Sequence, residues 1–262
     1  FLKSVAVSLT QASVAKNNSI VNKCLIVNDK EFSDDYERRN DVNFIFAPYL
    51  EKLDGQFQFS QVPIQRIFMP KLKYVGYQCF SDACLEELDL PMLEVISSHA
   101  FAGNKFVSLN LPSLKIMYDY YNFCACSNLQ FFQALNLTII LPCCFQDCTK
   151  LTTVIAPNAV IKEKAFKGCY QLETVAAKGD FKCNCDDCLK CRGNFIRCLQ
   201  RGAEYMEKSI QKDFGLKQRI FELEQQIISI KTQNQTQIDQ ISSQIGIIEQ
   251  KLDFLIEMVM KK

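Results

Sequence analysis

The sequence predicts an α/β repeat protein, in which a solenoid of short parallel strands is followed by a long C-terminal coiled-coil α-helix. Two observations predict this fold class. Three series of residues share one period of about 22 residues over most of the chain, which is typical of stacked structural repeats. Apolar residues then recur at steps of three and four near the C-terminus, which is the signature of a coiled coil.

The repeat is visible in three kinds of residue. A phenylalanine recurs at steps of 23, 21, 22, 22 and 21 residues: Phe57, Phe80, Phe101, Phe123, Phe145 and Phe166. A proline recurs at Pro48, Pro70, Pro91 and Pro112, with Pro157 two periods later. Apolar pairs three residues apart recur at Val42/Ile45, Ile64/Ile67, Leu85/Leu88, Phe106/Leu109, Leu129/Phe132, Leu151/Val154 and Leu172/Val175. Units this small cannot bury their own apolar side, so they must stack and share one core.

Residues 85–90 indicate how one unit folds. Leucines alternate with acidic residues at the end of this segment, which predicts a short strand with one face buried. Pro91 then ends the strand because it has no N–H for the next ladder, and Gly103 supplies a turn. A period near 22 is too short for helical-hairpin repeats and falls within the range of leucine-rich repeats.

These units resemble the BspA-type leucine-rich repeats of bacterial and protozoan proteins. The resemblance is carried by the motif LP-x-L-x-x-I followed by A-F-x-x-C-x-x-L, seen in residues 90–101 and 165–172. It covers about residues 42–180 and is specific for the fold rather than for a function. It implies surface adhesion or protein interaction. The fifth unit has Asn136-Leu-Thr in place of Leu-Pro, so we expect a local irregularity there.

Residues 1–41 fit the repeat poorly and are predicted to be a partial upstream repeat or an irregular N-terminal segment. Leu2-Lys-Ser-Val5 has the form of Leu151-Thr-Thr-Val154, which favours a sequence that begins inside an upstream repeat. A signal-peptide remnant is the alternative, although its apolar stretch is short and contains polar residues. The charged residues 34–41 indicate a solvated loop.

The chain contains 14 cysteines. Three of them, Cys126, Cys148 and Cys169, each follow a repeat phenylalanine by three residues, where earlier units have Ala83 and Asn104. A position that accepts Cys, Ala or Asn indicates a small inward-facing site. Free thiols that fill the core as small hydrophobes are the favoured interpretation, and disulfides are the alternative.

A separate cysteine cluster lies in residues 181–200, which are predicted to form a Cys-rich cap on the solenoid. Its members follow two overlapping C-x-x-C steps, close enough to share one tetrahedral zinc ion: Cys183, Cys185, Cys188 and Cys191, with Cys198 spare or substituting. A structural zinc is therefore a hypothesis, and no other cofactor is predicted. Unligated thiols and disulfides remain alternatives.

Residues 201–262 are predicted to be a connector and a coiled-coil helix. After Leu216 the seam of the coiled coil is expected at Ile220, Leu223, Ile227, Ile230, Asn234, Ile238, Ile241, Ile245, Ile248, Leu252, Leu255 and Val259. Two successive steps of four around Asn234 amount to a stutter. Asn234 favours a dimer, whereas isoleucine at both seam positions of the second half favours a trimer. A helix folded back on its own solenoid is the alternative to self-association.

Outward-pointing strand positions of successive units are the predicted binding surface, because solenoids bind through such extended faces. These candidates are Glu87, Asp89, Ser108, Asn110, Phe131, Gln133, Thr153 and Thr174. Phe131 is a candidate aromatic anchor, or a core residue of the irregular fifth unit. Ordinary solvated surface is the alternative interpretation of the whole set.

The chain is predicted not to be an enzyme. His99 is the only histidine, and the sequence lacks phosphate-binding, dinucleotide-binding, HExxH and EF-hand motifs. Thirty basic and 29 acidic residues nearly cancel, so nucleic acid is not an expected partner. No apolar run approaches the roughly 18 residues of a membrane span. We predict a non-enzymatic protein-interaction module, with protein partners, that self-associates as a dimer or trimer. A structural scaffold or a cell-surface adhesion protein is the alternative.

The expected location is cytoplasmic, because the repeat thiols are predicted to fill the core in reduced form. A cell-surface or secreted protein is the alternative if the N-terminus is truncated.

Overall fold

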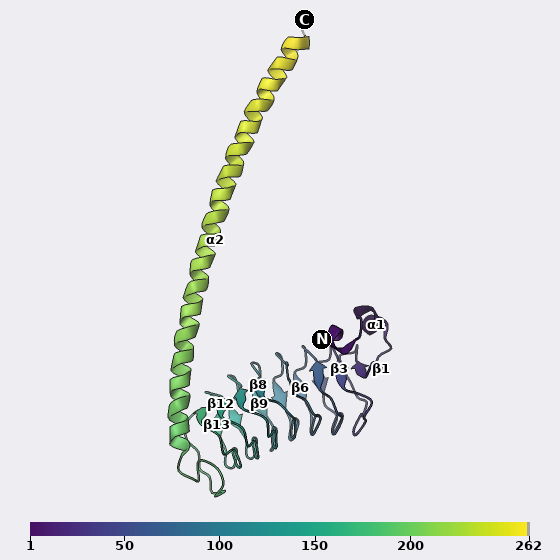
Figure 1. Cartoon of the computed structure of the whole chain (residues 1–262), viewed down its shortest axis with the longest axis vertical. Helices are drawn as coiled ribbons and strands as arrows, with labels where there is room; N and C mark the ends of the chain where they lie inside the picture. The colour runs from purple at the N-terminus through teal and green to yellow at the C-terminus, as the bar shows by residue number, and fades with distance from the viewer. Residues whose placement is uncertain (261–262) are drawn as a thin grey trace. The chain divides into compact units, whose positions relative to one another are not determined.

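The computed structural model describes the backbone of residues 1–260. It describes the side chains of residues 1–246, except those of 214, 215, 217, 228, 229, 232, 233, 236, 239 and 240. The chain divides into two units, Phe1–Met206 and Glu207–Lys262. The first unit is a solenoid of stacked coils, and helix α2 (Phe195–Met260) begins in the first unit and makes up the described part of the second (Figure 1). No helix in the described part of the chain has the length and apolar character needed to cross a membrane.

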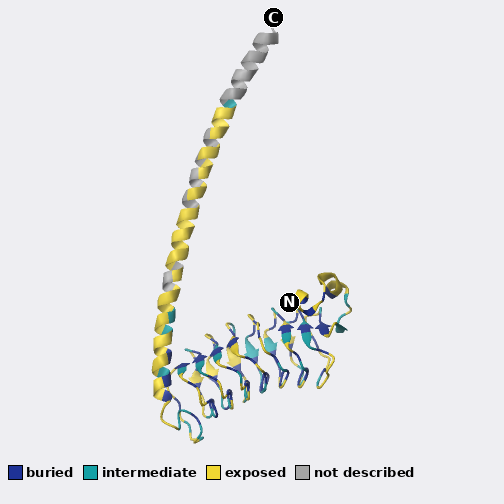
Figure 2. Ribbon diagram, in the orientation of Figure 1, coloured by how far each residue is buried: buried dark blue, intermediate teal, exposed yellow. Residues whose placement is uncertain are grey.

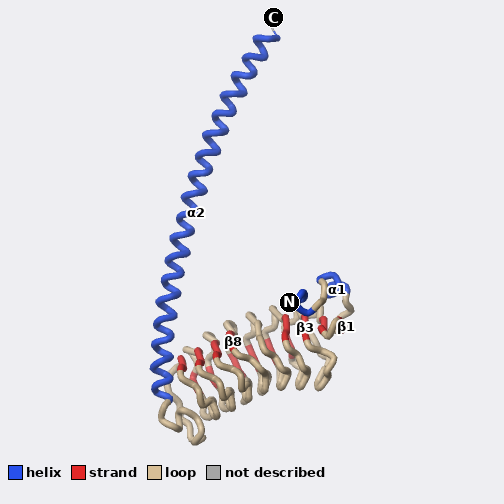
Figure 3. The backbone as a smooth tube through the Cα atoms, viewed as in Figure 1, coloured by secondary structure: helices blue, strands red, loops and turns tan. Residues whose placement is uncertain are grey.

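Most coils of the solenoid carry one short strand on each of two faces, and turns and loops make up the rest (Figure 3). Face A holds β2 (Cys24–Ile26), β3 (Phe44–Phe46), β5 (Arg66–Phe68), β8 (Ser108–Asn110), β10 (Phe131–Gln133), β12 (Thr153–Ile155) and β14 (Thr174–Ala176). Face B holds β4 (Lys52–Leu53), β6 (Tyr74–Val75), β7 (Val95–Ile96), β9 (Ile116–Met117), β11 (Ile139–Ile140) and β13 (Val160–Ile161). All pairs between these strands are parallel. The predicted solenoid of short parallel strands is therefore confirmed.

The core is a column of stacked phenylalanine rings that runs from coil to coil. Between consecutive rings from Phe59 to Phe166 the centroids lie 5.4–5.8 Å apart and the ring planes differ by 11° or less. Phe32 extends the column at one end and Phe195 at the other. The predicted apolar pairs are all buried beside it. Neighbouring coils therefore share one continuous core.

The phenylalanine column corrects one predicted position. Phe57 belongs to the spaced series in the sequence, but Phe59 occupies the column and is fully buried. Phe57 has a left-handed backbone (φ 59°) and makes an edge contact with Tyr77 instead. With Phe59 the step to Phe80 shortens to 21 residues, which matches the other steps of the series.

The small position beside the column is inward-facing, as predicted. Thiols there donate to the buried carbonyl of a column phenylalanine one coil earlier: Cys126 to Phe101, Cys148 to Phe123 and Cys169 to Phe145, with S···O distances of 3.3, 3.1 and 2.9 Å. All 14 cysteines are free. Burial raises the pKa of Cys126 to about 12, so its thiol keeps the proton that it donates. In the next coil towards the N-terminus, Asn104 makes the same bond to Phe80.

Each coil turns sharply at the residue two positions after its column phenylalanine. The residues at this turn have left-handed backbone in six successive coils: Gln61, Asp82, Gly103, Ala125, Asp147 and Gly168, with φ between 54° and 74°. Only two of the six are glycine, although glycine adopts this conformation without strain. A Cβ on Gly103 would lie 1.9 Å from the Asp82 carboxylate, so a side chain there would require Asp82 to move.

Residues 85–90 do not form the strand that their alternation predicts. Face A is interrupted between β5 and β8, although the flanking bonds from Glu86 N–H to Gln65 O and from Lys105 N–H to Leu85 O remain. Acidic residues are poor strand formers, and this segment carries three of them, Glu86, Glu87 and Asp89. Leu85 N–H bonds to the side chain of Asn104 at 2.9 Å, whereas the equivalent N–H of later coils, such as that of Leu129, bonds within its own turn.

The fifth unit is irregular, as its missing Leu-Pro predicts. Face B splits into two sheets between β9 and β11. Leu135 stands where proline is expected, and Asn136 keeps the regular contact between coils: it donates to the carbonyl of Pro112 at 2.7 Å, as Ser113 does to Pro91 at 2.6 Å. The parallel ladder of face B resumes at β11–β13.

The N-terminal segment joins the solenoid earlier than residue 42. Strand β1 (Ser19–Val21) pairs antiparallel with β2, and β2 already pairs parallel with β3. Leu2–Val5 forms the 3₁₀ helix η1, not the repeat strand that its likeness to residues 151–154 predicts, and helix α1 (Leu9–Val14) follows. Residues 34–41 form a loop, as predicted, but Tyr36 is buried against Phe32.

The other end of the solenoid is closed by the first turns of α2. Phe195 stacks on Phe166, and Cys198 donates to the carbonyl of Leu172 at 3.3 Å. Gly202 lies so close to the last strand of face A that a Cβ there would be 2.0 Å from Val175 O. The helix thereby covers the backbone edge of β14, which would otherwise remain open to pairing.

Candidate interaction surfaces and metal centre

The eight predicted binding residues lie on face A and point outward. Register places Ser108, Phe131, Thr153 and Thr174 in one row. Asn110 and Gln133 lie in the second row. Glu87 and Asp89 are exposed in the coil where the ladder is interrupted, and Phe131 is half-buried. The structure therefore brings the set onto one face.

Both ends of face A are covered by other parts of the first unit. Near the N-terminus, Leu2, Val5 and Ala12 form a small apolar cluster with Cys24 and Ile26 of β2. At the opposite end the second row continues into Ile155 and Ala176, which are 1% and 5% exposed. The exposed stretch of face A is thus its middle, from about residue 66 to residue 133 (Figure 2).

A pocket of about 310 Å³ opens at one edge of this exposed stretch. It is lined by Phe1, Arg66, Ile67, Phe68, Pro70, Glu87, Asp89 and Pro91. Phe1 packs on Phe68 with ring centroids 5.8 Å apart, and Arg66 Nε lies 3.7 Å from a Glu87 carboxylate oxygen. The pocket combines an apolar floor with two carboxylates, of which Glu87 is partly neutralised by Arg66.

Face B carries an apolar row that the sequence analysis missed. Its outward positions include Ile116, Ile139 and Val160, which are 38–40% exposed, and the half-buried Val95. Parallel register stacks Val95 on Ile116 and Ile139 on Val160. The signal was a fourth periodic series, with steps of 21, 23 and 21 residues. It was hidden because each residue stands next to a buried apolar one.

His99 lies in an aromatic cluster on the turns of the solenoid. Its ring stacks on Tyr121 at 4.8 Å and meets Tyr77 edge-on at 6.2 Å. Ser98 Oγ lies 2.9 Å from His99 Nδ1, but the same hydroxyl donates to Tyr120 O. Burial lowers the pKa of His99. The hydroxyl proton is directed away from the imidazole, which is not the arrangement of a nucleophile and its base.

Helix α2 begins at Phe195, so the predicted connector is part of one helix of 66 residues, roughly 100 Å long. The described apolar positions of the predicted seam are 42–56% exposed: Leu216, Ile220, Leu223, Ile227, Ile230, Ile238, Ile241 and Ile245. Asn234 is exposed as well. Ile248, Leu252, Leu255 and Val259 lie outside the described side chains.

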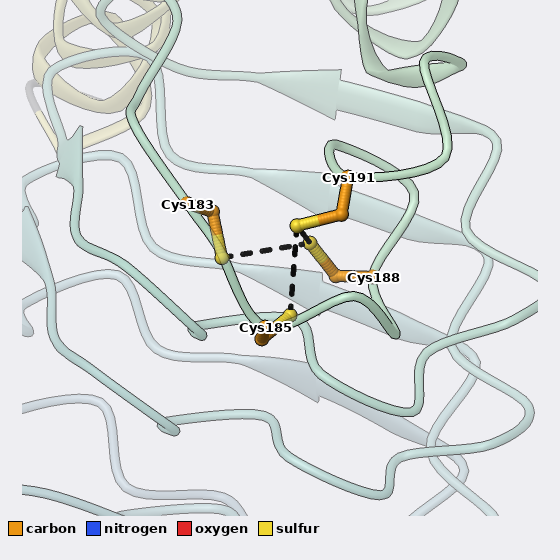
Figure 4. Close-up of side chains that lie close together, drawn as sticks. All are labelled: Cys183, Cys185, Cys188 and Cys191. Atoms are coloured by element: carbon orange, nitrogen blue, oxygen red, sulfur yellow. Dashed lines mark hydrogen bonds between the residues drawn. The ribbon is translucent and has the colours of Figure 1, made fainter.

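The predicted zinc ligands converge in the loop between β14 and α2. The sulfurs of Cys183, Cys185, Cys188 and Cys191 all lie within 4.8 Å of one another (Figure 4). Cys198 is not among them, because its thiol donates to Leu172 O. Although burial opposes it, hydrogen bonds from the Asp186 backbone and the neighbouring thiols lower the pKa of Cys191 to about 7.

The comparison with protein families agrees with the repeat architecture. The sequence profile of the BspA type leucine rich repeat region matches residues 54–173 in six copies. No curated protein matches the chain. Among solved structures, a leucine-rich repeat protein from Bacteroides ovatus ATCC 8483 is similar, with 24% identity and a TM-score of 0.46. The match covers 52% of this chain and 37% of that protein, so the chain spans little more than a third of its length.

Proposed function

We propose that this chain, which is a BspA-like leucine-rich repeat protein, is a non-enzymatic protein-interaction module that self-associates through α2. Repeats of this kind suggest an interaction or adhesion module. The observation that carries the proposal is the exposed apolar seam of α2, whose described positions keep the spacing of a coiled coil. The occupant of that seam is a second copy of this chain.

The seam supports self-association because of its length and its regularity. Its apolar side chains recur at steps of three and four over many turns, and each is about half exposed in the single chain. A stripe of this size facing water is unfavourable, whereas the same stripe on a second helix would bury it by knobs-into-holes packing. Asn234 would then lie at a core position, where it favours one register.

A pair of charge substitutions tests the coiled coil. We expect Leu223→Glu combined with Ile241→Glu to convert the oligomer into a monomer, because two carboxylates would be buried in each helix interface. Mass measured by light scattering during gel filtration reports the change. The matched control is Gln225→Glu combined with Ser243→Glu, which adds the same charge at exposed positions on the opposite side of the helix and leaves the oligomer intact.

Deletion of residues 216–262 completes the test. It keeps the turns of α2 that close the solenoid, so the solenoid remains folded, and the protein becomes monomeric. If the wild-type protein is monomeric at concentrations well above the micromolar range, self-association is wrong. If the truncated protein keeps the oligomeric state of the full chain, the association does not depend on α2.

The proposed location is the cytoplasm. Support comes from the thiols of the core, which donate hydrogen bonds to carbonyls and so occur in reduced form. Such thiols persist in a reducing compartment.

A further inference from the structure

We propose that Cys183, Cys185, Cys188 and Cys191 bind a single Zn²⁺ ion that closes the loop between the last coil of the solenoid and α2. The four residues come from the two arms of one short loop, and their sulfurs point toward a common centre (Figure 4). The site would be structural, because all four positions of a tetrahedral ion are filled by protein and none is left for a reactant.

The spacing of the sulfurs fits a tetrahedral ion. A Zn–S bond of about 2.3 Å places the ligands of a regular tetrahedron about 3.8 Å apart. The S···S distances are 3.8 Å for Cys185–Cys191, 3.7 Å for Cys183–Cys188 and 3.6 Å for Cys188–Cys191. The remaining pairs lie within 4.8 Å. Only small side-chain rotations separate this arrangement from a closed tetrahedron.

The same geometry argues against two disulfides. Cys188 lies almost equally close to Cys183 and Cys191, and Cys191 is also close to Cys185. The sulfurs therefore form one connected group and not two separate pairs. An iron–sulfur cluster also fits poorly, because cysteines that surround several metal ions must stand farther apart than those that share one ion. Soft thiolate ligands in a tetrahedron select Zn²⁺.

Contacts around the cluster support ligand thiolates. The backbone N–H of Lys164 donates to Cys183 Sγ at 3.2 Å. Such N–H···S bonds hold a thiolate in place and disperse its charge, as outer-shell contacts do in metal sites. Cys188 is buried and the other three are half-buried, so bulk water has limited access to the sulfurs.

The position of the loop indicates what the metal would stabilise. Phe181 before the cluster and Phe195 after it meet edge-on at 5.0 Å, and both contact Phe166 of the last coil. The cysteines thus lie in a loop whose two ends are already packed on the solenoid. A bound ion would fix this loop, and with it the first turn of α2, because binding energy of a structural metal is also folding energy.

Metal content and cobalt substitution test the proposal on the full chain. We expect one Zn²⁺ per chain by native mass spectrometry and elemental analysis. Replacement by Co²⁺ should give the strong thiolate-to-cobalt absorption and the visible bands of a tetrahedral site. Chelation should lower the melting temperature of the solenoid, and added Zn²⁺ should restore it.

Serine substitutions identify the ligands. Cys185→Ser and Cys191→Ser should each abolish stoichiometric zinc binding and the tetrahedral cobalt spectrum. Cys124→Ser and Cys198→Ser, which change cysteines outside the cluster, should keep both. Far-UV circular dichroism separates lost binding from lost folding, and both substituted cysteines are half-buried, so neither change creates a cavity in the core.

Two results would overturn the proposal. One is a folded, fully reduced wild-type protein that takes up neither Zn²⁺ nor Co²⁺ at micromolar concentration. The other is an equal loss of metal in the Cys124→Ser control, which would place the ion elsewhere. Neither result bears on self-association through α2, so the two proposals fail independently.

Discussion

At the scale of single residues, the repeat depends on which side chain enters the column. Phe57 and Phe59 are the same type of residue and lie two positions apart, yet only Phe59 is stacked between Phe32 and Phe80. The left-handed backbone at Phe57 turns that side chain away. Spacing alone separates the two only weakly, because the step of 23 residues from Phe57 to Phe80 exceeds the later steps of 21–22 by a single residue.

This difference predicts unequal costs of truncation. Phe59→Ala should lower the free energy of unfolding by about 3–5 kcal/mol, because it leaves a cavity in the column. Phe57→Ala should cost only about 1 kcal/mol, since this half-buried ring leaves no enclosed cavity. Urea denaturation followed by circular dichroism measures both values. Equal costs, or a larger cost for Phe57→Ala, would show that the column is misassigned.

At the scale of elements, the solenoid needs a closed end, and the first turns of α2 provide it. Glycine is a poor helix former, so Gly202 within α2 requires a reason. That reason is its contact with Val175 O, because any side chain at this position would push the helix off β14. Arg201 adds an ion pair with Glu173 at 3.5 Å, although an exposed pair of this kind contributes little.

Two glycines of the same helix provide a matched comparison. Gly202→Ala should destabilise the solenoid by roughly 1–3 kcal/mol, because the added methyl group overlaps the last strand. Gly246→Ala should be neutral or stabilise α2 by up to about 1 kcal/mol, since nothing lies within 4 Å of a Cβ there. Thermal melting of both variants measures the difference. A neutral Gly202→Ala would argue against close packing of α2 on β14.

At the scale of the whole molecule, the solenoid exposes the middle of face A, and α2 exposes an apolar seam. We infer that the exposed middle of face A binds a protein segment in which a basic side chain follows an apolar one. The pocket beside Phe1 offers Phe68 and the two prolines for the apolar part, and Glu87 and Asp89 for the charge. Self-association would then raise the avidity for a multivalent partner.

Peptide selection on the full chain tests this face. We expect displayed peptides enriched in Lys or Arg beside an apolar residue, and binding reduced at least tenfold by Glu87→Gln combined with Asp89→Asn. Isothermal titration with a selected peptide gives the affinities. Glu163→Gln, which neutralises an exposed acid just after β13 in a different coil, should leave the affinity unchanged. Selected peptides without basic residues, or binding unaffected by the double variant, would contradict the assignment.

The sequence by itself determined the solenoid, its period, the inward residues, the cysteine cluster and the helical heptads. These follow from local periodicity, because every coil repeats the same packing problem and solves it with the same residue types. Only the tertiary structure decided that Phe59 replaces Phe57, that residues 85–90 leave the ladder, and that β2 already belongs to face A. It also decided that the ends of face A are covered and that an apolar row lies on face B. Each of these depends on contacts between segments far apart in the chain, which a one-dimensional pattern does not contain.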